Sequence, residues 1–124
     1  MTDEILKNYS PLSLAFLGDG VYELLVREMI VSEANRPVGE LHKMAVTYVK
    51  ASFQAAAADK ISESLTETEA DIYRRGRNAN GVHIPKSASP AEYRKATGFE
   101  AVFGYLYLKG DRERIEELFK LIIS

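Results

Sequence analysis

Hydrophobic residues along most of the chain recur every three to four positions, the spacing typical of amphipathic helices. The segment from Pro37 to Asp59 has this spacing and is predicted to be one helix, and the segment after Asp111 is predicted to be another. No stretch alternates between apolar and polar residues as a half-buried β-strand would. Residues 78–89, NANGVHIPKSAS, have no period and are predicted to form a loop. The pattern therefore predicts an all-α fold, and we expect one domain over residues 1–124.

Residue types that favour helix ends mark the expected boundaries. Ser10-Pro11 and Ser89-Pro90 each place a capping serine before a proline at the first helical position. Thr66 and Glu69 have the spacing of a capping box. Gly110 is of the type that ends a helix, and the residue after it, an aspartate, is expected to cap the next one.

The stretch LGDG, residues 17–20, lies inside the most apolar segment of the chain, SLAFLGDGVYELLV. Asp-Gly between two apolar runs is also a hairpin signal, so two strands are the alternative. The apolar positions nevertheless stay in helical phase through the glycines, which favours a helix. This stripe consists of Leu14, Leu17, Val21, Leu24 and Leu25. Because the opposite face, which carries Asp19, is also largely apolar, we expect a helix that is buried on all sides.

The segment after Pro90 has the same combination of an apolar surface and one carboxylate, that of Glu100. If the two helices pack together, Asp19 and Glu100 meet. Two carboxylates in one pocket repel each other unless a proton, a base or a cation joins them. Carboxylate oxygens with few other protein ligands suit Mg²⁺, whereas an ion pair of Asp19 with Arg27 or Arg94 is the alternative that this spacing leaves open.

The net charge of −2 is unevenly distributed along the chain. Between Ile72 and Lys95 six basic residues face one acidic residue, so this window carries +5 and the rest of the chain −7. The basic residues are Arg74, Arg75, Arg77, Lys86, Arg94 and Lys95. Such a distribution predicts one anion-binding surface on an otherwise acidic protein.

Composition excludes several classes of chemistry. The chain has no cysteine, which rules out disulfides, thiolate zinc sites and cysteine nucleophiles, and which suits a reducing cytoplasm. No apolar run approaches the roughly 18–20 residues that span a bilayer. The two histidines, His42 and His83, fall in a predicted helix and a predicted loop, and no Ser-His-Asp set is apparent.

Two segments resemble the motifs of a known enzyme family. Residues 14–24, LAFLGDGVYEL, resemble the ribonuclease III signature helix LEFLGDAVLEL, and residues 95–106, KATGFEAVFGYL, resemble its second motif, KADVFEALIGAIY. With RRGRNA at residues 74–79, this short chain resembles the Mini-ribonuclease III branch of the family, which lacks a double-stranded-RNA-binding domain. Two of the family's four carboxylates are absent, because Ala15 and Thr97 occupy their positions, and the branch that the chain resembles lacks the same two acids.

The resemblance implies an all-helical, homodimeric endonuclease domain that hydrolyses double-stranded RNA with Mg²⁺ and leaves 5′-phosphate and 3′-hydroxyl ends. It implies that Asp19 and Glu100 are the catalytic, Mg²⁺-binding residues and that the substrate is the precursor of 23S ribosomal RNA. It leaves open whether a large-subunit ribosomal protein assists. The expected RNA contacts are Arg74, Arg75, Arg77, Asn78 and Lys86. The alternatives are a non-catalytic RNA- or ribosome-binding module of the same fold and a helical interaction protein whose acids form ion pairs.

Overall fold

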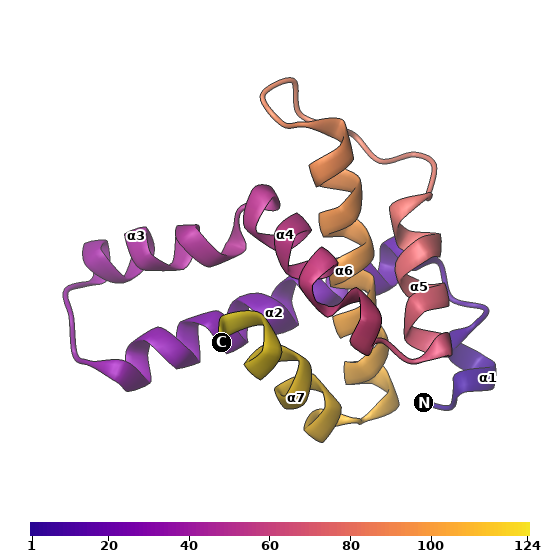
Figure 1. Ribbon diagram of the computed structural model, residues 1–124, viewed down its shortest axis with the longest axis horizontal. Coiled ribbons are helices and arrows are strands. Elements are labelled where there is room, and N and C mark those ends of the chain that lie inside the picture. Colours follow the sequence, from indigo (N-terminus) through magenta and orange to yellow (C-terminus); the bar gives the residue numbers. More distant parts are fainter.

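The computed structural model describes residues 1–124, and all of its regular structure is helical (Figure 1). In chain order the elements are α1 (Asp3–Leu6), α2 (Pro11–Glu33), α3 (Val38–Val49), α4 (Ala51–Ile61), the 3₁₀ turn η1 (Ser62–Ser64), α5 (Glu67–Arg77), α6 (Pro90–Lys109) and α7 (Arg112–Ile123). The predicted all-α fold is confirmed, and residues 78–89 form the predicted loop between α5 and α6. None of these helices is long and apolar enough to cross a membrane.

Helix α6 runs through the middle of the molecule, with α5 beside it and α2 and α4 crossing it (Figure 1). Every residue of α6 from Ala96 to Leu106 is buried except Glu100. The core is built on this helix, where the ring of Tyr22 from α2 lies 5.0 Å from that of Phe99 and 5.7 Å from that of Phe103. The middle of α6 is therefore buried on all sides apart from Glu100.

Helix α2 is continuous from Pro11 to Glu33, so a hairpin at LGDG is excluded. The prediction that this helix is buried on all sides is wrong. One face packs against α6 and is buried at positions spaced four residues apart: Leu14, Gly18, Tyr22, Val26 and Ile30. The helices around α2 leave its other face uncovered, and there Phe16 is 86% exposed and Leu24 is 66% exposed. Part of the apolar stripe of α2 is therefore a surface of the single chain.

The segment from Pro37 to Asp59 forms two helices, so the prediction of one helix is wrong. The helix is interrupted at Lys50, whose backbone is extended with φ −66° and ψ 151°. Two side chains donate to carbonyl groups at the end of α3: the Tyr22 hydroxyl to Tyr48 O at 2.7 Å, and Gln54 Nε2 to Val49 O at 2.8 Å. These bonds satisfy acceptors that the interrupted helix leaves free. The break lets α4 turn and pack against α6.

The predicted helix ends are confirmed where α5, α6 and α7 begin and where α6 ends. Thr66 and Glu69 form both bonds of a capping box, and the Ser89 side chain accepts from the Glu92 amide. Gly110 adopts the left-handed conformation with φ 84°, and Asp111 caps α7. These local signals fix where α5, α6 and α7 begin and where α6 ends.

Candidate active site

The helices α2 and α6 cross so closely at two glycines that no side chain fits between them. A Cβ atom at Gly18 would lie 1.6 Å from the backbone oxygen of Glu100, and one at Gly104 would lie 1.9 Å from that of Leu14. Both distances are far below van der Waals contact, so alanine at either position would push the helices apart. A Cβ atom at Gly20 would have no other atom within 4 Å, so Gly20 is not needed for the close approach of the two helices. The crossing at Gly18 explains why Asp19 lies beside Glu100.

Asp19 and Glu100 are brought together from two different helices, as the sequence predicts. Asp19 is exposed and Glu100 is half-buried. The pKa of the Glu100 carboxyl is raised to about 8, first by burial and then by the negative charge of Asp19 and a hydrogen bond to it, while the Gln54 amide acts in the opposite direction. Without a bound cation Glu100 therefore keeps its proton near neutral pH.

Neither carboxylate takes part in an ion pair with a basic side chain. Arg27 pairs with Glu23 at 3.3 Å, and Arg94 donates to the backbone oxygen of Ala79 at 3.2 Å. Both arginines that could have neutralised Asp19 are thus occupied elsewhere. The alternative of a structural ion pair is excluded.

Gln54 is a further polar residue at this place, and the sequence analysis missed it. It lies in the first turn of α4, is 3% exposed, and its amide faces the Glu100 carboxyl. Its side-chain oxygen has no hydrogen-bond partner. The signal in the sequence was a polar residue directly before the alanine run 55–58, in a segment that otherwise reads as core.

The available ligands fit a hard cation that brings most of its own water. No group of three or more His, Cys, Asp or Glu side chains that could hold a metal ion occurs in the structure. The site instead offers two mutually repelling carboxylates, and the Gln54 amide beside them has an oxygen without a hydrogen-bond partner. Oxygen ligands in small number suit Mg²⁺, which retains several water molecules when it binds to proteins.

The predicted RNA contacts lie on α5 and on the loop that follows it, and several already have partners. Arg74 pairs with Asp71, and Arg75 donates to the backbone oxygen of Tyr9 at 3.1 Å. Arg77 donates to Asn78 Oδ1 and lies over the ring of Tyr73. Lys86 is exposed and makes no ion pair.

A second close contact holds this basic segment against α6. A Cβ atom at Gly76 would lie 2.9 Å from Gly98 Cα, and one at Gly98 would lie 2.5 Å from the backbone oxygen of Tyr73. Gly98 is two residues before Glu100 on the same helix. The C-terminal turn of α5 therefore packs on the half of α6 that carries the carboxylate.

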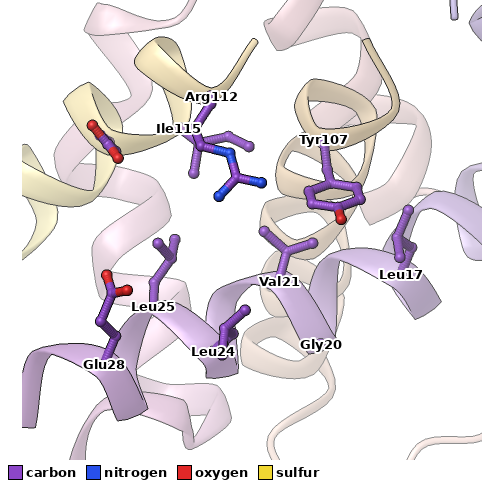
Figure 2. A pocket seen from close by; sticks show the side chains of 10 residues that line it. Leu17, Gly20, Val21, Leu24, Leu25, Glu28, Tyr107, Arg112 and Ile115 are labelled. Carbon is purple, nitrogen blue, oxygen red and sulfur yellow. The ribbon is translucent and has the colours of Figure 1, made fainter. Parts of the chain in front are cut away.

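A pocket of about 320 Å³ lies beside the uncovered face of α2 and is lined mostly by apolar side chains. Figure 2 shows Val21, Leu24 and Leu25 of α2 facing Tyr107 of α6 and Ile115 of α7 across it. Neither Asp19 nor Glu100 lines this pocket. It is a feature separate from the carboxylate pair, on the apolar surface that the single chain leaves exposed.

Residues 12–111 match the family described as the Ribonuclease III domain. A Mini-ribonuclease 3 of Thermoanaerobacter sp. (strain X514) is 48% identical, over 100% of this chain and 87% of that protein. A Mini-ribonuclease 3 of Symbiobacterium thermophilum is 52% identical, over 87% of this chain and 83% of that protein. A crystal structure of a Fusobacterium nucleatum protein superposes with a TM-score of 0.86 at 34% identity, covering 94% of each chain. The family match includes the carboxylate pair, the basic helix and the loop.

Proposed function

This chain belongs to the ribonuclease III family and is an endoribonuclease, and from this we propose that it cleaves double-stranded RNA at a Mg²⁺ site held by Asp19 and Glu100. The observation that carries the proposal is the carboxylate pair itself. Its members come from two helices, lie in hydrogen-bonding contact and have no basic partner, so their repulsion is relieved only by a proton or a cation. A structural pair of this kind would gain nothing from remaining unneutralised.

The residues of the pair have different tasks. Mg²⁺, when bound, supplies an activated water and stabilises negative charge on the scissile phosphate and the departing 3′ oxygen. Glu100, half-buried on α6, gives up its proton as it binds the cation, and the Gln54 amide favours that ionised form. Asp19, exposed on α2, holds the cation where a substrate can reach it. Since His42 and His83 are both exposed and neither belongs to the pair, no side chain is assigned as a covalent nucleophile.

The basic residues support an RNA-binding surface next to this site. A-form RNA presents a major groove too deep and narrow for side chains, so recognition relies on phosphates, 2′-hydroxyls and shape. Arg74, Arg77 and Lys86 are proposed phosphate contacts, and Asn78 a contact to a base edge or 2′-hydroxyl. Arg75 is also a proposed phosphate contact, and it additionally links α5 to the backbone oxygen of Tyr9, which lies just before α2.

We propose that a second copy of the chain covers the exposed apolar face of α2. Phe16 and Leu24 are large, apolar and mostly exposed, and Leu24 lines the pocket of Figure 2. Contiguous apolar surfaces of this kind mark interaction sites, and identical chains most often associate through one self-complementary patch. Leu24→Asp is expected to give a monomer in sedimentation equilibrium. Val46→Asp, at an exposed apolar residue on α3, is the matched control that stays dimeric.

The proposed natural substrate is the precursor of 23S ribosomal RNA, which the resemblance to Mini-ribonuclease III implies. A large-subunit ribosomal protein is the partner to add when cleavage of that precursor is measured. With this substrate and this partner, the proposed location of the protein is the cytoplasm. The observation that favours a second candidate, a non-catalytic binding module, is that Ala15 and Thr97 leave the site with two carboxylates.

One experiment separates these functions. Wild type, Asp19→Asn and Glu100→Gln are incubated with long double-stranded RNA and Mg²⁺, with single-stranded RNA of the same sequence as the control. Cleavage of the duplex by wild type alone supports the proposed enzyme. Binding of the duplex without cleavage by any of the three supports the non-catalytic module. Absence of binding by all three leaves only a helical interaction protein.

A further inference from the structure

Gln54 is the only glutamine in the chain, and its amide is held in one orientation. Its Nε2 donates to the backbone oxygen of Val49, the last residue of α3, at 2.8 Å. Turning the amide over would set its oxygen against that carbonyl oxygen, so the hydrogen-bond network assigns which end is nitrogen. Oε1 is then the one buried side-chain oxygen or nitrogen of the structure without a hydrogen-bond partner.

A buried acceptor without a partner points to a group that completes it, commonly a water molecule or an ion. Gln54 lies beside the Glu100 carboxyl, and Glu100 in turn contacts Asp19. Three helices, α2, α4 and α6, therefore each contribute one polar side chain to the same place. No neighbouring side chain takes up this task, because Ala15 has no polar side-chain atom and the Thr97 hydroxyl donates to Tyr93 O.

We propose that Gln54 is a positioning residue of the cation site, which holds the Glu100 carboxylate through its N–H groups and accepts a hydrogen bond at Oε1 from the cation's hydration shell. The inference rests on the proposed function, since it assumes that a hydrated divalent cation binds to the carboxylate pair. Mg²⁺ keeps several of its waters, and the hydrogens of those waters need acceptors. Groups that orient a ligand in this way affect metal affinity although they do not touch the metal.

A purely structural role for Gln54 makes a different prediction. The bond from Nε2 to Val49 also stabilises the break between α3 and α4, and the Tyr22 hydroxyl makes the equivalent bond to Tyr48 O at 2.7 Å. Tyr22→Phe removes that second bond, keeps the ring packed in the core and leaves the carboxylate pair untouched. It is therefore the matched control for Gln54→Met, which removes the amide and keeps a side chain of similar length.

The test is a titration of the metal-free protein with Mn²⁺, followed by electron paramagnetic resonance in the absence of RNA. We expect Gln54→Met to weaken Mn²⁺ binding by about 10- to 100-fold, as is typical when a group that orients a ligand is lost. Tyr22→Phe is expected to bind Mn²⁺ like wild type. Wild-type affinity in Gln54→Met, or an equal loss in Tyr22→Phe, overturns the proposal. If Asp19→Asn also binds like wild type, the proposed metal site itself is wrong.

A measurement on the unmodified chain keeps the proposal testable if Gln54→Met does not fold. Because the chain has one glutamine, labelling with ¹⁵N-glutamine gives a single glutamine side-chain amide signal. This signal is expected to shift on addition of Mg²⁺ to wild type and to stay in place in Asp19→Asn. A signal that does not move in wild type, at a Mg²⁺ concentration that saturates binding, overturns the proposal.

Discussion

Replacing Glu100 by glutamine is expected to stabilise the metal-free protein at neutral pH. The pKa of this carboxyl is about 8 in the folded protein and about 4.5 in its ordinary state. Between these values the folded chain keeps a proton that the unfolded chain has lost, so folding stability falls as the pH rises from 4.5 to 8. At about 1.4 kcal/mol per pH unit, the loss reaches about 3 kcal/mol at pH 7. Screening of the exposed Asp19 by salt reduces this to about 2 kcal/mol.

The measurement is urea unfolding followed by circular dichroism at pH 5 and pH 7, in EDTA and at one protein concentration. Glu100→Gln should exceed wild type by about 2 kcal/mol at pH 7 and by less than about 1 kcal/mol at pH 5. Glu63→Gln, at an exposed glutamate without an ion pair, is the control and should match wild type at both values. A Glu100→Gln variant that is less stable than wild type at pH 7, or a difference that does not change with pH, would refute the raised pKa of Glu100 that burial and the charge of Asp19 produce.

Three further outcomes follow from the same geometry. Gly18→Ala should destabilise the fold in thermal melts and abolish cleavage, because its Cβ meets the Glu100 backbone, whereas Gly20→Ala should be neutral or stabilising by up to about 1 kcal/mol. Mg²⁺ should raise the melting temperature of wild type more than that of Asp19→Asn, and the effect should grow from pH 6 to pH 8 as Glu100 loses its proton more readily. Duplex binding should fall with salt at a log–log slope of roughly −3 to −4, and Lys86→Ala should reduce that slope by about 1; a slope near zero would count against the basic surface.

The parts of the fold that depend on neighbouring residues in sequence could be predicted from it. Caps at Thr66 and Ser89 and the stop at Gly110 lie where their residue types place them, because each bond joins groups a few positions apart. The meeting of Asp19 and Glu100 could also be predicted, since each is a carboxylate on an apolar helix that has to pack on another. The capping residues were sufficient to predict the helix ends, and the helical phase of the apolar residues was sufficient to predict that the two carboxylates meet.

The break at Lys50 could not be predicted in this way, and the reason also explains why Gln54 was missed. Leu41, Ala45 and Val49 keep helical phase up to the break, so the pattern alone favours one continuous helix. What ends α3 is a pair of side-chain bonds to its last carbonyls, and one donor, Tyr22, comes from α2. A continuous helix would satisfy those carbonyls itself and would leave Gln54 no carbonyl to bind at Val49. The bond that interrupts the helix is thus the same bond that orients the Gln54 amide toward Glu100. Gln54 can therefore join the two carboxylates only because the helix ends at a place that the hydrophobic pattern does not predict.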